Sequence, residues 1–492
     1  MLAEYETAVN TGQPVFMDAD ELSEIADFYQ MTGQQEEARA AINLALSLSP
    51  GAIAPLTYCI HEALYRGDTQ EAWRLLDQIV EKNEPDYIYD RGEILIVEDR
   101  IDEADEYFRE EFRKVPPEEY QDFVVDVANI YSDYGISDKA MEWLARSKPE
   151  DTPDFKELMA RTLFGLGKYK DSERLWGELI DTDPFQKRYW NALASTQFMN
   201  EDYSHAIESS EYAIAIDPDD PEGLISKANG LYRMGNYEQA LEYYRRYLQQ
   251  EPDDEFAILH ESTCLINTGE TDEAISRLEE ATQIAAPDSP YLADIYQELA
   301  FAYSEKEQPD EALHYLNLTD DLDCDHVQTL VIKGHIMLAA GRLEEAEDYF
   351  RDAVIYSDDA TQTLLRVIVS LYDNHYLEAS YKMLKKFFAI APKGNTEGYA
   401  YMALCCHDLK RPEEFKKYLK TACRINPQEC RTVLAHLFPK DIEPENYYDY
   451  LTSFEDKDQA NPQISILKSQ SSNLNPQPSN LKSQPHPCFP PY

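Results

Sequence analysis

The stretch Trp190–Pro218 reads WNALASTQFMNEDYSHAIESSEYAIAIDP and contains two short amphipathic segments. In the first segment Trp190 and Leu193, and in the second Tyr203 and Ile207, are spaced three or four residues apart, as on one face of a helix. The proline at the end closes the second segment, because proline cannot continue a helix. The stretch therefore predicts one helix, a turn and a second helix.

The same pattern recurs along most of the chain. In several copies a small residue follows an acidic pair, as in DEA or EEA, and we call the residue at this position of each copy the anchor. The anchors are Ala38, Ala72, Ala104, Ala140, Ser172, Ala206, Ala240, Ala274, Ala312, Ala346, Ala379 and Phe415. Their intervals range from 32 to 38 residues, and a fixed period of this length is typical of a solenoid.

A second set of mostly small residues stands twelve positions before the anchors. These residues are Ala26, Ile60, Gly92, Ala128, Ala160, Ala194, Ala228, Ser262, Ala300, Gly334, Val367 and Ala403. One small site in each of two helices lets the antiparallel pair approach closely. A glycine in many of the intervening turns supplies the left-handed conformation that ends a helix. These glycines are Gly33, Gly67, Gly135, Gly167, Gly235, Gly269 and Gly341.

The pattern W-x2-L-A…Y-x2-A…A-x4-P within Trp190–Pro218 resembles the tetratricopeptide repeat. The resemblance is strongest between Lys187 and Ala286, whereas Phe415, Ile60 and Val367 depart from it. It implies an all-α, right-handed superhelical solenoid of about twelve helix-turn-helix repeats with terminal capping helices. It also implies that the first helix of each repeat lines a concave face on which ligands bind.

The repeats divide the chain into four expected regions. We expect an N-terminal cap over residues 1–18 and the repeat array over 19–427. Helices over 428–454 would cover the last repeat, as the terminal cap of a stack must. Residues 455–492 are rich in Pro, Ser, Asn and Gln, a composition typical of a disordered low-complexity tail.

Composition narrows the possible partners. The formal net charge of −50 disfavours nucleic acid and anionic membrane surfaces, both of which require basic residues. We therefore expect a protein or peptide partner with basic and apolar residues, although acids on exposed helix faces can also serve solubility alone. No signal peptide or membrane span is evident, and the eight cysteines lack disulfide-framework spacing, which favours a cytoplasmic location.

No catalytic motif stands out in the sequence. A Gly-rich phosphate loop, HExxH and GxSxG are all missing, and the acidic pairs recur at helix starts, where the helix dipole favours them. We predict no enzyme activity, no cofactor and no metal site. The alternative is an enzyme or metal protein using the Cys405–Cys430 region, but adjacent Cys405 and Cys406 point to different sides of a helix and are expected in the core. A self-assembling structural solenoid is a further alternative.

The first helix of each repeat carries a second stripe at 15, 11 and 8 residues before the anchor. Only Glu93, Glu157 and Arg161 are charged among the 27 stripe positions of repeats two to ten, so the stripe predicts a largely neutral peptide-binding groove. The predicted groove residues are Phe164, Asn191, Phe198, Ile225, Asn229, Tyr232, Leu259, Ile266, Phe301, Val331 and His335. Packing against neighbouring helices is the alternative explanation of this stripe.

Acids stand eighteen residues before several anchors, at the expected entrance of the groove. They are Asp20, Asp86, Asp122, Asp154, Glu222 and Asp294. Family members that hold the acidic C-termini of chaperones resemble one another in a Lys at 15 and an Asn at 11 before the anchor. Here Asn229 and Asn129 follow Ile225 and Val125 instead of lysine, which argues against that ligand. We expect a non-catalytic interaction scaffold that binds peptide segments in a concave groove.

Overall fold

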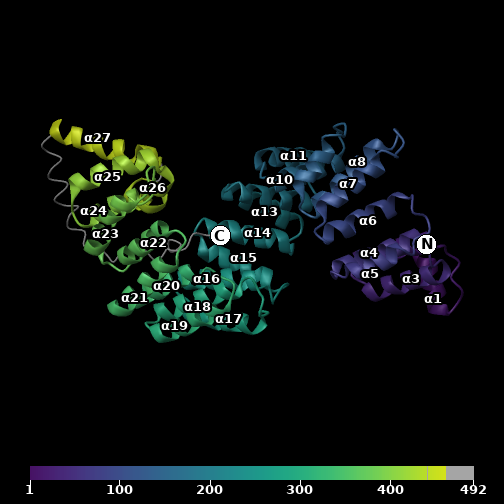
Figure 1. Cartoon of the computed structure of the whole chain (residues 1–492), viewed down its shortest axis with the longest axis horizontal. Helices are drawn as coiled ribbons and strands as arrows, with labels where there is room; N and C mark the ends of the chain where they lie inside the picture. The colour runs from purple at the N-terminus through teal and green to yellow at the C-terminus, as the bar shows by residue number, and fades with distance from the viewer. Residues whose placement is uncertain (440–441, 461–492) are drawn as a thin grey trace. The chain divides into compact units, whose positions relative to one another are not determined.

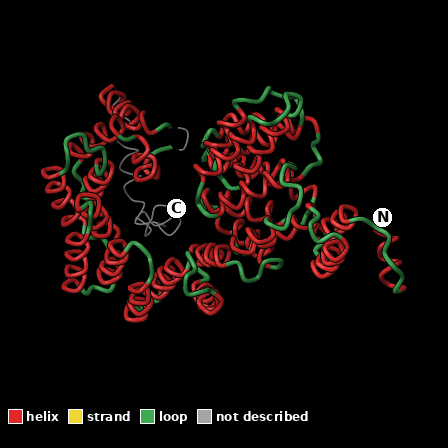
Figure 2. The backbone as a smooth tube through the Cα atoms, turned by 45° about the vertical axis from the view of Figure 1, so that its right-hand side comes forward, coloured by secondary structure: helices red, strands yellow, loops and turns green. Residues whose placement is uncertain are grey.

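The computed structural model describes residues 1–439 and 442–460, and these residues form helices joined by short loops, without strands (Figures 1 and 2). The chain divides into two compact units, Met1–Asp202 and Tyr203–Tyr492. The all-helical class and the repeated helix-turn-helix units predicted from the sequence are confirmed. Most of the predicted tail lies outside the described residues.

The first unit begins with a single helix and continues with antiparallel pairs. Its helices are α1 Leu2–Thr11, α2 Ala19–Met31, α3 Gln35–Leu48, α4 Ile53–Tyr65, α5 Thr69–Leu76, α6 Pro85–Val97, α7 Ile101–Phe112, α8 Tyr120–Asp133, α9 Ser137–Leu144, α10 Pro153–Gly165, α11 Tyr169–Thr182 and α12 Lys187–Met199. Helix α1 packs on the first pair through Tyr5, which is buried beside Tyr29 with the ring centroids 6.3 Å apart.

The second unit repeats the arrangement and ends in helices that cover its last pair. Its helices are α13 Tyr203–Ile216, α14 Pro221–Arg233, α15 Tyr237–Leu248, α16 Glu255–Thr268, α17 Thr271–Ile284, α18 Leu292–Glu305, α19 Pro309–Leu318, α20 His326–Ala339, α21 Leu343–Tyr356, α22 Ala360–Asp373, α23 Leu377–Ile390, α24 Tyr399–Asp408, α25 Pro412–Ile425, α26 Pro427–Leu434 and α27 Tyr447–Ala460. Short 3₁₀ turns follow α19 and α26 and precede α27. Helices α26 and α27 pack on α25, and α27 continues past residue 455, where the tail is predicted to begin.

Local sequence signals start the helices of the second unit. Asp220 caps α14 by accepting a hydrogen bond from the Gly223 amide at 2.9 Å, and Pro221 occupies the first helical position. Asp254 caps α16 in the same way through the Ala257 amide at 2.8 Å. Each cap satisfies a backbone donor that the first helical turn leaves unpaired.

A left-handed residue closes the first helix of all twelve pairs in the described residues. Seven of these residues are the predicted turn glycines. The other five are not glycine and still adopt φ between 57° and 64°: Asp99, Glu201, Glu307, His375 and Lys410. The turn geometry is therefore fixed by the repeat even where the sequence lacks the residue that favours it.

The structure corrects one anchor. Ala379 is exposed, whereas the next residue, Ser380, is fully buried and donates a hydrogen bond to the Ile368 carbonyl at 3.2 Å. Ser172, a confirmed anchor, makes the same contact with the carbonyl twelve residues before it. The prediction of Ala379 as the anchor was wrong, because in this repeat the acidic residue stands two positions before the buried anchor and not directly before it. The small site twelve residues before the anchor is accordingly Ile368 and not Val367.

Small residues at the predicted sites do allow close helix contact. An added Cβ on Gly92 would lie 1.9 Å from the Phe108 ring, and one on Gly334 would lie 2.4 Å from the Phe350 ring. Phe108 is fully buried, so its ring has no room to move away. The glycine in α6 is therefore required by the aromatic ring that α7 packs against it.

We expect Gly92→Ala to lower the free energy of unfolding by about 2 kcal/mol, because the methyl group overpacks the α6–α7 interface. Thermal melting followed by far-UV circular dichroism measures the change. Gly177→Ala is the matched control, since nothing lies within 4 Å of its added Cβ in α11. That control should raise stability by roughly 0.5–1 kcal/mol through helix propensity, and equal shifts for the two variants would contradict the packing argument.

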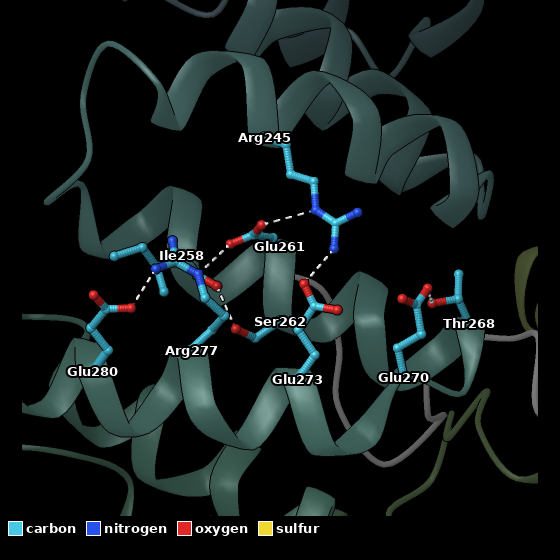
Figure 3. Close-up of polar contacts among 9 residues, drawn as sticks. All are labelled: Arg245, Ile258, Glu261, Ser262, Thr268, Glu270, Glu273, Arg277 and Glu280. Atoms are coloured by element: carbon cyan, nitrogen blue, oxygen red, sulfur yellow. Dashed lines mark hydrogen bonds and ion pairs between the residues drawn. The ribbon is translucent and has the colours of Figure 1, made fainter.

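A buried carboxylate lies in the core of the second unit (Figure 3). Glu261 on α16 is 4% exposed and contacts Arg277 Nε at 2.9 Å and Arg245 Nε at 3.5 Å. Each arginine also binds an outer carboxylate at 2.6 Å, Glu280 for Arg277 and Glu273 for Arg245. The network links α15, α16 and α17. Glu261 stands thirteen residues before its anchor, where the repeat of Trp190–Pro218 has the apolar Leu193.

Candidate functional site

The first helices of the pairs lie in a row within each unit, which we call the inner row. Most neighbouring members contact one another, as in α2 with α4, α4 with α6, α16 with α18 and α20 with α22. Successive second helices make no contact of similar extent within the described part of the chain. Because one side of the stack is closely spaced and the other is wider, each unit curves with its inner row on the concave side.

Eight of the predicted groove residues lie on the inner row of the second unit. They are Ile225, Asn229, Tyr232, Leu259, Ile266, Phe301, Val331 and His335, on α14, α16, α18 and α20. Leu259 and Val331 are buried, and the other six are half-buried. The remaining three, Phe164, Asn191 and Phe198, lie on α10 and α12 of the first unit, where Asn191 is buried.

Several of these residues take part in contacts between helices, among them Tyr232 and Asn229. The Tyr232 ring lies 5.0 Å from the His260 ring and 5.8 Å from the Tyr237 ring, and burial raises the pKa of its hydroxyl. Asn229 accepts a hydrogen bond from the Tyr244 hydroxyl at 2.7 Å. The side chains of Tyr232 and Asn229 therefore support the packing of α14 against its neighbours.

An acidic group lies on the inner row of the second unit beside these residues. Glu298 on α18 is half-buried, but its carboxyl lies between stacked helices, and this burial raises its pKa to about 7. Repulsion by Asp294 acts in the same direction, whereas a hydrogen bond from the Thr263 hydroxyl opposes both. The site can therefore exchange a proton near neutral pH.

The inner row of the first unit is more acidic. Burial, followed by repulsion from Asp90, raises the pKa of the Asp86 carboxyl. Burial also raises the pKa of Asp126, which accepts a hydrogen bond from the Tyr89 hydroxyl at 2.9 Å and faces Asp122 and Asp86. These carboxylates come from α6 and α8 and together form a strongly negative surface.

One histidine lies among these carboxylates. His61 Nε2 on α4 is 3.2 Å from Asp90 Oδ1 and 3.0 Å from Glu93 Oε2, both on α6. The two carboxylates raise the pKa of His61 to about 10, with the hydrogen bond to Asp90 as the larger cause. The pKa of Asp90 is nevertheless raised, because its burial outweighs the attraction of the imidazolium.

Most of these polar residues share one position in the repeat. Asp90, Asp126, His260 and Glu298 all stand fourteen residues before an anchor, a position that the predicted stripe omitted. That position faces the preceding first helix, as in the contacts of Asp90 with His61 and of Asp126 with Tyr89, so its side chains meet across the inner row. The recurrence of titratable residues fourteen positions before an anchor is the sequence signal from which these residues could have been predicted.

The cysteines of the Cys405–Cys430 region lie in the core, as predicted. Cys405, Cys406, Cys423 and Cys430 are all buried. Burial raises the pKa of Cys405 to about 11 and that of Cys406 to about 12, so both are protonated thiols at neutral pH. Cys423 and Cys430 hydrogen-bond to each other, which lowers the pKa of Cys423 and raises that of Cys430.

None of the described helices combines the length and the apolar character needed to cross a membrane. No curated protein matches the sequence. Similar solved structures include PilW, described as a widely conserved type IV pilus biogenesis factor (19% identity, 44% of this chain and 100% of that chain, TM-score 0.38). Another is MamA 41-end from Desulfovibrio magneticus RS-1 (14% identity, 35% of this chain and 96% of that chain, TM-score 0.34). A third is YrrB, described as a TPR protein with an unusual peptide-binding site (21% identity, 39% of this chain and 95% of that chain, TM-score 0.33).

Three tetratricopeptide repeat family models match parts of the chain. One matches residues 197–255 and 231–299, a second matches 158–221, and a third matches 397–429. The matched segments coincide with helix pairs of the same length and order as those that the period predicts. Its helix-turn-helix pairs and these three family matches show that the chain contains tetratricopeptide repeats.

Proposed function

We propose that the chain is a non-catalytic interaction scaffold whose inner row binds a peptide segment of a partner protein. The observation that carries the proposal is the set of half-buried apolar side chains on successive first helices of the second unit, among them Ile225, Ile266 and Phe301. They border the repeat cores without being fully covered, so a ligand can complete their burial. Each square ångström of apolar surface removed from water contributes about 25 cal/mol, against which the entropy lost on association is set.

The charge of the inner row selects a basic partner. Glu298 and Asp294 lie on α18 with Phe301, and burial together with repulsion by Asp294 raises the pKa of Glu298, a shift that a nearby cation would compensate. A lysine or arginine of a bound peptide would supply that compensation. The net charge of −50 also accelerates encounter with cationic segments.

In this proposal the scaffold consists of repeats over residues 19–427, closed by a cap over 1–18 and by helices over 428–454, with a tail over 455–492. The buried, protonated thiols of Cys405 and Cys406 support a core role for this region over a catalytic one. A thiol nucleophile would need a lowered pKa and access to solvent.

Selection from a random peptide library on the full-length protein tests the proposal. We expect the selected peptides to carry apolar anchors flanked by Arg or Lys. Ile266→Arg should weaken their binding at least ~10-fold, because it replaces an apolar contact on α16 with a charge that repels basic residues. Fluorescence anisotropy with labelled peptides measures the affinity.

Ser276→Arg on the exposed side of α17 is the matched control, since it adds the same charge away from the inner row. This variant should bind the peptides as the wild-type protein does. Circular dichroism of both variants verifies that the helices are intact. Selection of no peptide above background, or equal weakening by both substitutions, would remove the inner row as the binding site.

A further inference from the structure

Three potential ligand atoms converge on the inner row of the first unit. His61 Nε2, a carboxylate oxygen of Asp90 and one of Glu93 all lie within 4.8 Å of one another. They come from two adjacent first helices, α4 and α6. Within the described residues this is the single group of three or more His, Cys, Asp or Glu side chains with such spacing.

The distances between these ligand atoms fit side chains that bind one ion. His61 Nε2 lies 3.0 Å from Glu93 Oε2 and 3.2 Å from Asp90 Oδ1. Metal–ligand bonds of about 2.0–2.2 Å at angles between 90° and 110° place neighbouring ligand atoms roughly 3.0–3.5 Å apart. An ion could therefore replace the shared proton of this cluster with small side-chain movements.

A second layer of contacts orients the buried ligand. The Thr57 hydroxyl donates a hydrogen bond to Asp90 Oδ2 at 2.7 Å, which leaves Oδ1 directed at His61. The Asp90 side chain is 2% exposed, so its position is fixed by packing as well. Ordered partners of this kind hold carboxylate ligands in place in metal sites.

The surroundings favour a cation and leave it accessible. Asp86 and Asp27 lie close enough to interact electrostatically with His61, and they add negative charge around the cluster. The His61 side chain is 55% exposed, which leaves one side of the cluster open to solvent. Water can thus complete the coordination shell of an ion held by three protein ligands.

We propose that His61, Asp90 and Glu93 bind one divalent first-row transition-metal ion, with Zn²⁺ or Co²⁺ preferred over Mg²⁺ and Ca²⁺. An imidazole nitrogen with two carboxylates suits these borderline ions, whereas Mg²⁺ and Ca²⁺ prefer ligand sets made of oxygen alone. The ion links α4 to α6 across the concave side of the first unit. This binding is independent of the proposed peptide ligand.

Isothermal titration of the untagged full-length protein with Zn²⁺, in buffer containing excess Mg²⁺, tests the proposal. We expect one equivalent to bind. His61→Gln and Glu93→Gln should each weaken binding at least ~100-fold, because a ligand is lost, and Thr57→Val should weaken it about 10-fold through the orientation of Asp90. His407→Gln should have no effect, since this control removes a histidine that pairs with only one carboxylate, Asp408.

The absorption spectrum of the Co²⁺-loaded protein separates this cluster from the cysteines. We expect visible d–d bands without the intense near-ultraviolet charge transfer that thiolate ligands produce. Zn²⁺ binding with unchanged affinity in both His61→Gln and Glu93→Gln, a thiolate spectrum, or no binding by the wild-type protein would overturn the proposal. Glu93→Gln keeps the size of the side chain, so it decides the question if circular dichroism shows that His61→Gln perturbs the helices.

Discussion

Replacing Arg277 with alanine is expected to lower the local stability of α16 and α17 by about 3 kcal/mol, because it leaves a buried carboxylate without its closer cation. Glu261 would then keep only the 3.5 Å contact with Arg245. Hydrogen exchange of peptides from these helices measures the change. The amides should exchange roughly 100-fold faster than in the wild-type protein, since each factor of ten corresponds to about 1.4 kcal/mol.

Two controls isolate the buried charge in this network (Figure 3). Glu280→Ala removes only the exposed outer pair of Arg277 and should change stability by less than about 0.5 kcal/mol. The double variant Glu261→Leu with Arg277→Met should recover most of the loss, because apolar residues can replace a buried ion pair without penalty. If Arg277→Ala and Glu280→Ala gave equal effects, the buried carboxylate would not be the cause.

Replacing Glu298 with glutamine is expected to stabilise the second unit at pH 8 by about 3 kcal/mol, which corresponds to a pKa raised from 4.5 to about 7. The folded state binds this proton more tightly than the unfolded state. The group therefore favours folding below pH 4.5, and that contribution is lost as the pH rises toward 7. Glutamine removes the ionised form and with it the destabilisation at high pH.

Urea unfolding of the variant and the wild-type protein at pH 5 and pH 8 measures the difference. The variant should exceed the wild-type protein in stability at pH 8 and lie close to it at pH 5. Glu305→Gln, on an exposed position of the same helix, should change stability by less than about 0.5 kcal/mol at either pH. A gain that is the same at both pH values would show that folding does not raise the pKa of Glu298.

The candidate site could be predicted only in part. The positions of Ile225, Ile266 and Phe301 on the first helices could be predicted, because the stripe spacing follows helix geometry, which a single sequence contains. The acidic and histidine residues at fourteen before the anchor were missed, because their environment depends on the neighbouring first helix. His61 stands eleven residues before the Ala72 anchor and so belongs to the predicted stripe, but its contacts with Asp90 and Glu93 join residues about thirty positions apart.

The sequence by itself determined the repeat. The period, the small sites, the turn glycines and the closing prolines are local signals. Each reflects what a single helix pair needs in order to pack, so it can be recognised within one repeat. Only the tertiary structure decided how neighbouring helix pairs pack against each other. It placed Ser380 in the core instead of Ala379, imposed left-handed turns on five residues other than glycine, and divided the array into two units after Asp202. It also brought His61, Asp90 and Glu93 together, because contacts between first helices depend on how the pairs stack, which no single repeat encodes.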